Sequence, residues 1–321
     1  MLQERLQEGG VGQKEAAVWE RPESVASAWE IQRAAGFRTE PQSSASSRLR
    51  SVRESLREII TPRKAIGAQR FEHGEKPQGI EALSIVIPTL NEQFYIHKLL
   101  NSLVRQHFNG DLQIIVVDGK SEDDTVATVQ KFQDRLSIEI VSAERDIGHQ
   151  KNVGAELARN KHLLFLDADI TLPPGALNKL ASSVDPEERI VDNAVLVPSP
   201  LKFLDTMVVL AGNATLSVIN RFEPAMIGAF ILTTKENHER VDGFKEGAII
   251  GEDLDYAIRS VRDGAKNHMH LDVYAYNSTR RGDRMGKVRA VLSWAKAYFY
   301  VRKHGPIYKN FYYPYGDYKK R

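Results

Sequence analysis

The strongest constraint on the fold of this chain is a regular alternation of strand-like and helix-like segments over residues 83–166. Short apolar runs rich in β-branched residues occupy 83–87, 113–117, 137–141 and 162–166. Each run predicts a strand buried on both faces. Between the runs, apolar residues recur at helical spacing, as at Ile96, Leu99 and Leu103. This order predicts an α/β fold with a mostly parallel, doubly wound sheet flanked by helices, the type that binds nucleotides.

Beyond Pro173 the alternation loosens, but further elements can be read from the spacing of apolar residues. Helices are expected at 175–184, 202–221, 252–263 and 286–304, and strands at 191–197 and 229–233. His268 and His270 are expected on one further strand.

The charge of the chain is unevenly distributed. The 321 residues include 44 basic and 42 acidic side chains and no cysteine. The net charge is +2 over 1–80, −10 over 81–275 and +10 over 276–321. We therefore expect one domain at 81–275, between an N-terminal extension, partly disordered or helical, and a basic, aromatic, helical tail. The lack of cysteine excludes a disulfide scaffold, a thiolate zinc site and a cysteine nucleophile.

Neither a secretory signal nor a membrane span is expected. Residues 1–10 contain no apolar run behind a basic start. The longest apolar-leaning stretch, 203–219, is interrupted by Asp205 and Asn213. We expect a cytoplasmic protein, either soluble or peripheral on the inner face of the membrane. Within the extension, 47–60 predicts an amphipathic helix, either a marginal surface helix or a contact for a homo-oligomer or a membrane.

Polar residues follow three of the predicted strands, at 88–92, 118–124 and 167–169. Ligands of open α/β sheets bind beyond the carboxyl ends of the strands, so carboxylates gather at one edge. Asp167 and Asp169 leave the sheet on the same side, because side chains alternate along a strand. Two such carboxylates suit Mg²⁺ or Mn²⁺ holding a diphosphate. Alternatively, these aspartates cap the helix after Pro173 or face solvent.

A series of ordered motifs covers about 83–275. They are Ile85-Val-Ile-Pro-Thr-Leu-Asn-Glu92, Ile115-Val-Val-Asp-Gly-Lys-Ser-Glu-Asp-Asp-Thr125, Gly148-His-Gln-Lys-Asn-Val-Gly154, Phe165-Leu-Asp-Ala-Asp169, Val241-Asp-Gly-Phe244 and Gly251-Glu-Asp-Leu-Asp-Tyr-Ala-Ile-Arg259. In this order they resemble the family-2 glycosyltransferases of GT-A fold, a Rossmann-like fold for nucleotide-diphospho-sugar transferases. The resemblance implies transfer of a sugar from a UDP- or GDP-sugar, with Mg²⁺ or Mn²⁺ as cofactor.

The resemblance also implies roles for particular residues. Nucleotide-sugar-binding positions are Pro88, Thr89, Glu92, Asp118, Asp123, Lys151, Asn152, Asp167 and Arg281. Asp167 and Asp169 match the metal motif, with Asp169 as the direct ligand. Asp253 matches the catalytic base, and Glu252 is its catalytic neighbour. One departure from the family pattern is Gly119, where a second aspartate is common, so one nucleoside contact is absent or supplied elsewhere.

The chemistry of transfer fits these roles. Charge that gathers on the leaving diphosphate is stabilised by a cation, and the acceptor hydroxyl must lose a proton to a positioned carboxylate such as Asp253. A single displacement inverts the anomeric centre. Glu252 and Asp253 could instead only cap their helix, because acidic residues favour helix N-termini.

Other residues have a functional and a structural interpretation. Gly228 and Ala229 resemble a close backbone approach beside the acceptor, or are simple packing. His149 faces phosphate or solvent, and His268 or His270 is a candidate third metal ligand. Arg280, like Arg281, falls where related enzymes carry basic residues in a segment that closes over the diphosphate, or it belongs to a solvated basic loop.

The basic tail begins with a helix at 286–304 in which aromatic and basic residues mix. This helix either lies on an anionic membrane and presents a lipid-linked acceptor or packs on the acidic domain. No nucleic-acid-binding motif accompanies its charge. The acceptor is open: a lipid-linked, polysaccharide or small-molecule hydroxyl. Two alternatives to a glycosyltransferase are a nucleotidyltransferase, which lacks its expected phosphate loop here, and a non-catalytic scaffold of the same fold.

Overall fold

The computed structural model describes residues 79–200, 203–220 and 223–309. They belong to the second of two compact units of the chain, which begins at Ile66. The predicted helix at 47–60, most of the N-terminal extension and the end of the basic tail lie outside the described residues. The division of the chain into three regions therefore stays a prediction.

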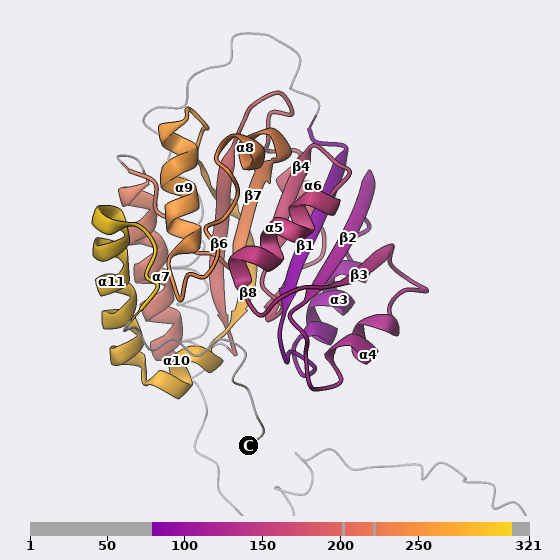
Figure 1. The fold of residues 1–321 in the computed structure, drawn as a ribbon, viewed down its shortest axis with the longest axis horizontal. Helices are drawn as coiled ribbons and strands as arrows, with labels where there is room; N and C mark the ends of the chain where they lie inside the picture. Colours follow the sequence, from indigo (N-terminus) through magenta and orange to yellow (C-terminus); the bar gives the residue numbers. More distant parts are fainter. Residues whose placement is uncertain (1–78, 201–202, 221–222, 310–321) are drawn as a thin grey trace, which may run out of the picture. The chain divides into compact units, whose positions relative to one another are not determined.

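The first half of the described chain has the predicted alternation of strands and helices (Figure 1). Its elements are β1 (Ala82–Thr89), α3 (Ile96–Val104), β2 (Asp111–Asp118), α4 (Thr125–Gln130), β3 (Ile138–Ser142), α5 (Ile147–Leu157) and β4 (His162–Leu166). The four strands pair in parallel in the order β3-β2-β1-β4. The predicted α/β sheet is confirmed.

The second half extends the same sheet with a different connectivity. Its elements are β5 (Ile170–Thr171), α6 (Ala176–Ala181), β6 (Val191–Ser199), α7 (Phe203–Ile219), β7 (Phe230–Thr234), α8 (Lys235–Arg240), α9 (Glu252–Arg262), β8 (Met269–Ser278), α10 (Arg280–Met285) and α11 (Lys287–His304). In the described chain the sheet has eight strands and continues from β4 as β7-β6-β8-β5. β7 runs antiparallel to both of its neighbours, so the sheet is mixed.

Alternate residues of the central strands enter two apolar cores, one on each face of the sheet. In β1, Ile85 and Ile87 pack with α3 and α6, whereas Val86 packs with the core that includes Tyr256 of α9. Both sides of these strands are buried, which explains why their sequences are continuous apolar runs. On the second face, α5 packs closely on β1 at Gly154. A Cβ added there would be only 2.2 Å from Val86 Cγ1, so the glycine allows this close approach.

No helix in the described part of the chain is long and apolar enough to cross a membrane. The parallel register aligns Thr89 with Asp118, and β4 lies on the other side of β1. The loops after β1, β2 and β4 therefore leave the sheet at one edge, where the sequence predicts the chemistry.

Candidate active site

Hydrogen bonds tie the loop after β1 to the loop after β2. The Asn91 backbone N–H donates to Ser121 Oγ at 2.9 Å, and the Glu122 N–H donates to Asn91 Oδ1 at 2.8 Å. The Glu92 N–H donates to Thr125 Oγ1 at 2.8 Å. Asn91 has a positive φ of 56°, a backbone conformation that asparagine tolerates. The two loops predicted to line a nucleoside thus form one connected unit.

Asp118 and Asp123 both stabilise these loops. The Asp118 carboxylate accepts the Ser121 backbone N–H at 2.9 Å and the Ser121 hydroxyl at 2.5 Å, and it is buried. Asp123 Oδ1 accepts the Thr125 N–H at 3.0 Å. Pro88 and Thr89, at the end of β1, are buried beside the same unit. The predicted nucleoside contacts of these residues stay predictions, while their loop-shaping contacts are present.

Gln150 of α5 is a buried residue of this edge that sequence reasoning missed. Its Nε2 donates to the carbonyls of Thr89 at 2.8 Å and Val117 at 2.7 Å, which ties the ends of β1 and β2 together. The signal that could have identified Gln150 is a polar side chain inside the motif that begins at Gly148 and ends at Gly154.

Asp169, Glu92 and Arg280 form a compact cluster beside Asp167. The guanidinium of Arg280 contacts both carboxylate oxygens of Glu92, at 2.6 and 2.5 Å, and its Nε donates to Asp169 Oδ2 at 3.0 Å. It also lies 4.2 Å from the ring centroid of Tyr95. Burial raises the pKa of Glu92 to about 7, against the opposing effect of Arg280 and with a further rise from Asp169 and Asp167.

The arginine that contacts Glu92 and Asp169 is Arg280, in the first turn of α10. The structure does not describe the side chain of Arg281, so the role predicted for it stays a prediction. Arg280 lies in a short helix rather than in a loop. Because Met285 is the one apolar residue of this helix, its sequence has no apolar spacing from which a helix could be predicted.

The two aspartates after β4 fit a divalent cation that completes its ligand set elsewhere. Within the described residues there is no group of three or more His, Cys, Asp or Glu side chains arranged to hold a metal ion. Mg²⁺ in phosphate-transfer sites is commonly held by one or two carboxylates plus substrate phosphates and water. The ion pair of Asp169 with a guanidinium is consistent with a carboxylate that favours a positive charge. Asp167 and Asp169 therefore fit Mg²⁺ or Mn²⁺.

His270 of β8 and His268, just before this strand, do not extend this pair. His270 Nε2 lies 3.0 Å from Asp192 Oδ2, and the His268 N–H donates to Asp192 Oδ1 at 2.7 Å. Asp192 pairs with Leu232 of β7, which in turn pairs with Leu164 within β4. Both histidines thus contact an aspartate inside the sheet, and the expectation of a third metal ligand there has no structural support.

Lys151 of α5 forms a buried ion pair with Glu252 at the start of α9. The Lys151 Nζ lies 3.1 Å from Glu252 Oε1, and the two side chains are 1% and 9% exposed. The ammonium also lies 4.8 Å from the ring centroid of Phe244. Burial lowers the pKa of Lys151, but Glu252, Asp167 and Asp253 together outweigh burial and raise it. Lys151 is therefore a buried cation among the predicted catalytic carboxylates.

Asp253 lies next to Lys151 and Glu252 and packs against Gly228. A Cβ added at Gly228 would lie 2.4 Å from Asp253 Oδ2, so only glycine fits there without displacing the carboxylate. Burial and the neighbouring Glu252 raise the pKa of Asp253 to about 6, while Lys151 opposes them. The carbonyl of Ala229 accepts the Asp167 N–H at 3.1 Å. The segment 228–229 thus links the metal pair to the predicted base.

The N-cap of α9 is Gly251, with a φ of +91° and no side-chain capping bond. Glu252 contacts Lys151, and Asp253 Oδ1 accepts the Leu254 N–H of the first turn at 2.8 Å. Glu252 therefore has a partner outside the helix, whereas Asp253 contacts a backbone N–H of its own first turn.

Asn152 contacts the turn at 241–244 and the residues after it. Its Oδ1 accepts the Phe244 N–H at 2.8 Å, and its Nδ2 donates to the Phe244 carbonyl and to Glu246 Oε1, both at 2.9 Å. Next to it, His149 Nδ1 lies 3.1 Å from Glu246 Oε1. The two neighbouring polar residues thus have different contacts, since Asn152 holds this turn and Lys151 holds Glu252, and the predicted contact of Asn152 with the donor stays a prediction.

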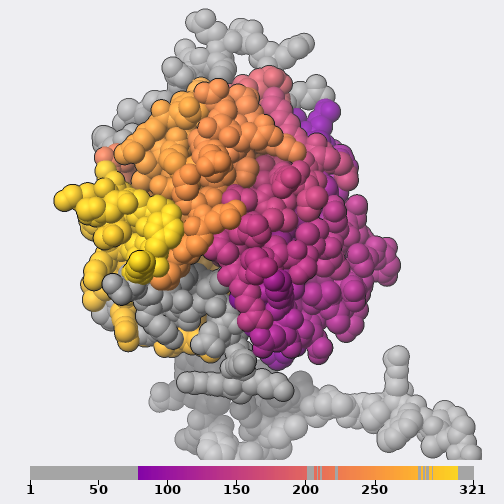
Figure 2. Space-filling view, in the orientation of Figure 1, coloured from indigo at the N-terminus to yellow at the C-terminus, as the bar shows by residue number. Residues whose placement is uncertain are grey.

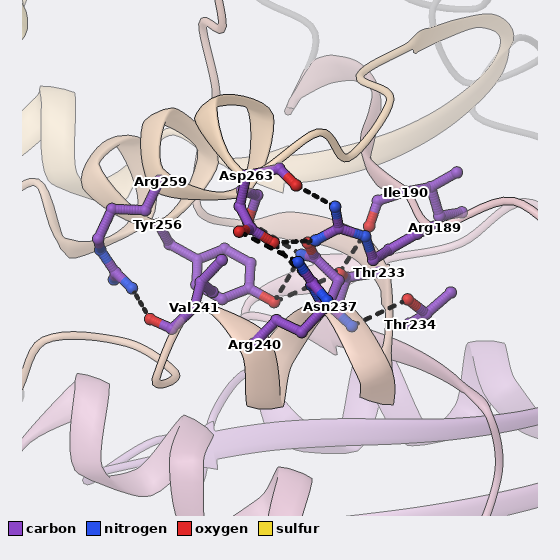
Figure 3. A network of polar contacts seen from close by, with 11 residues as sticks. Arg189, Ile190, Thr233, Thr234, Asn237, Arg240, Val241, Tyr256, Arg259 and Asp263 are labelled. Carbon is purple, nitrogen blue, oxygen red and sulfur yellow. Dashed lines mark hydrogen bonds and ion pairs between the residues drawn. The ribbon is translucent and has the colours of Figure 1, made fainter.

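A polar network fixes α9 against β7 and α8 (Figure 3). Asn237 Nδ2 donates to Thr233 Oγ1 at 3.0 Å and to Ser260 Oγ at 2.9 Å. At the end of α9, the Asp263 carboxylate accepts from Arg189 at 2.5 Å and from Arg240 at 2.7 Å. The network therefore holds the middle and the C-terminal end of α9, the helix whose first turn carries Asp253.

Residues 84–211 match the family model described as glycosyl transferase family 2. This part of the chain is thus similar to glycosyltransferase family 2. Poly(ribitol-phosphate) beta-N-acetylglucosaminyltransferase TarS of Staphylococcus aureus is 32% identical over 106 residues, which are 32% of this chain and 18% of TarS. GalNAc(5)-diNAcBac-PP-undecaprenol beta-1,3-glucosyltransferase of Campylobacter jejuni is 37% identical over 102 residues, 30% of this chain and 33% of the relative. The matches span a third or less of these relatives.

Solved structures confirm the GT-A fold. The crystal structure of S. aureus TarS 1–349 in complex with UDP-GlcNAc superposes with a TM-score of 0.51 at 21% identity, over 64% of this chain and 60% of that one. The mannosyltransferase PcManGT of Pyrobaculum calidifontis, in complex with GDP-Man and Mn²⁺, gives 0.55 at 21% identity, over 80% and 72%.

Proposed function

We propose that this chain is a metal-dependent, inverting glycosyltransferase that moves a sugar from a nucleotide-diphosphate sugar to an acceptor hydroxyl. The observation that carries the proposal is that Asp167 and Asp253 both contact the segment 228–229. The Asp167 backbone N–H donates to the Ala229 carbonyl, and the Asp253 side chain packs on Gly228. The proposed metal motif and the proposed base are therefore joined by one short backbone segment.

The solved neighbours support the choice of donor. TarS is described in complex with UDP-GlcNAc, and PcManGT in complex with GDP-Man and Mn²⁺. A UDP- or GDP-sugar and a divalent cation are therefore the donor and cofactor that we propose here. The alternative of a nucleotidyltransferase has no comparable support among these neighbours.

The proposed roles follow from the contacts of each side chain. A cation held by Asp169 and Asp167 would offset negative charge on the leaving diphosphate. Asp253 accepts the proton of the acceptor hydroxyl, and its raised pKa keeps it basic enough for this task near neutral pH. Lys151 holds Glu252 in place beside Asp253. One base and one displacement correspond to inversion at the anomeric carbon.

Calorimetric titration with UDP-, GDP- and dTDP-sugars, with and without Mn²⁺, tests this proposal. One donor is expected to bind, and only when Mn²⁺ is present. Asp169→Ala should lower this binding by at least tenfold, since a charge-assisted ligand is lost. Asp272→Ala, at an exposed aspartate of β8, is the matched control and should bind like the unaltered chain. Equal binding by Asp169→Ala, or no binding of any donor, would contradict the proposal.

We also infer peripheral membrane contact through α11, which has two different faces. Its inner face packs on α9: Ala297 and Val301 form a cluster with Leu254. Its outer face carries Leu292 and Phe299, which are 65% and 71% exposed. The helix includes five Lys or Arg residues and no acidic residue, and it lies at the surface in yellow in Figure 2. Exposed apolar and basic side chains together suit an anionic lipid surface.

Vesicle flotation tests this contact. The chain is expected to float with vesicles that contain phosphatidylserine, less so at high salt, and not with phosphatidylcholine alone. The double variant Leu292→Ser/Phe299→Ser should float less. Leu271→Ser, at an exposed leucine of β8, is the control and should not change flotation. Flotation of the double variant equal to that of the control would exclude α11 as the contact.

A further inference from the structure

Arg280 makes contacts in the site that its predicted role, closing over the diphosphate, does not explain. It reaches the metal motif from the start of α10, directly after β8, and its side chain is 11% exposed. The guanidinium makes a two-point contact with Glu92, a single contact with Asp169 and a stacking contact with Tyr95. The Arg280 guanidinium is thus a largely buried positive charge, neutralised by these carboxylates, at the position where a metal cation is expected.

The contact with Asp169 conflicts with cation binding. The Arg280 Nε donates to Asp169 Oδ2 at 3.0 Å. A divalent cation bound to the same carboxylate would lie beside the guanidinium, and two positive charges at such a separation repel strongly in a partly buried site. Arg280 and the cation therefore compete for Asp169.

We propose that Arg280 is a positioning residue that holds Asp169 in place of the cation, and that a cation binds after Arg280 releases this aspartate. The inference rests on the proposed function, because it takes Asp169 as the metal ligand. The two contacts with Glu92 and the stacking on Tyr95 do not involve Asp169. Release therefore breaks one charge-assisted hydrogen bond, while the guanidinium stays anchored beside the site.

The test is the affinity of the full chain for Mn²⁺ alone, measured without donor from the electron paramagnetic resonance signal of free Mn²⁺. Arg280→Gln removes the competing charge and is expected to bind Mn²⁺ roughly tenfold or more tightly, from the usual strength of a hydrogen bond to a charged group. General damage to the site would weaken Mn²⁺ binding, so a gain in affinity separates competition from misfolding.

Two further variants keep the test decisive. Arg280→Met retains an apolar stem over Tyr95 and should give the same gain, so it serves if Arg280→Gln does not fold. Arg284→Gln, at an exposed arginine of the same helix, is the control and should leave the affinity unchanged. If the folded Arg280 variants bind Mn²⁺ no more tightly than the unaltered chain, the inference fails.

The outcome also separates this inference from the proposed function. Suppose that Asp169→Ala loses Mn²⁺ binding while the Arg280 variants bind as the unaltered chain does. This result would support the metal site and contradict only the role of Arg280. If neither the unaltered chain nor the Arg280 variants bind Mn²⁺ without donor, the role of Arg280 is contradicted, while the proposed function is decided by the titration with donor and Mn²⁺ together.

Discussion

Asp253→Asn is expected to reduce sugar transfer by about a hundredfold to ten-thousandfold, the range typical for loss of a general base. Asparagine has nearly the shape of aspartate, so it fits against Gly228, but it cannot accept a proton from the acceptor hydroxyl. Mn²⁺ and donor binding should persist, because Asp167 and Asp169 are unchanged. The variant therefore separates the proposed base from the proposed metal site.

The measurement is release of nucleoside diphosphate from the donor that binds, in the presence of an acceptor preparation that supports turnover. The unaltered chain should become more active as the pH rises through about 6, because Asp253 loses its proton there. Asp272→Asn, an exposed aspartate, is the matched control and should keep full activity. Full transfer by Asp253→Asn, or loss of donor binding together with activity, would remove Asp253 from the role of base.

The elements that the sequence predicted well are those with long, unmixed patterns. The run at 162–166 is apolar throughout and ends at Asp167, and the structure has β4 with these same bounds. The short elements β5, α8 and α10 were missed, because β5 has only two residues and the two helices hold almost no apolar residues that could reveal a helical period. The sequence also does not predict that β7 is antiparallel to its neighbours, since the direction of strand pairing depends on contacts between distant segments.

In the candidate site, too, some residues could be predicted from the sequence and their partners could not. Asp167, Asp169 and Asp253 could be predicted from motifs, and the structure brings their neighbourhoods together. Their partners could not, because Lys151 and Glu252 are 101 residues apart in sequence, and Arg280 and Glu92 are 188 apart. Motif spacing indicates which residue types are present at the edge of a sheet, but only the folded chain decides which charges neutralise one another.

The buried pair of Lys151 and Glu252 should dominate the stability of the site. Lys151→Met leaves the Glu252 carboxylate buried without a partner, and such a loss typically costs about 3–5 kcal/mol of unfolding free energy. Lys151 stays charged in the folded protein through the neutral range, because its pKa is raised above the usual 10.5. Its contribution to stability is therefore present near neutral pH and declines only as the pH rises through that raised value.

The double variant Lys151→Met/Glu252→Gln distinguishes a charge effect from a packing effect. With both charges removed, neither side chain is buried as an unpaired ion, so most of the lost stability should return. Urea unfolding followed by circular dichroism measures all three proteins. Lys161→Met, at a half-exposed lysine paired with Glu187, is the control and should change little. If the double variant were as unstable as Lys151→Met alone, the contact of the Lys151 ammonium with the Phe244 ring, and not its ion pair with Glu252, would account for the lost stability.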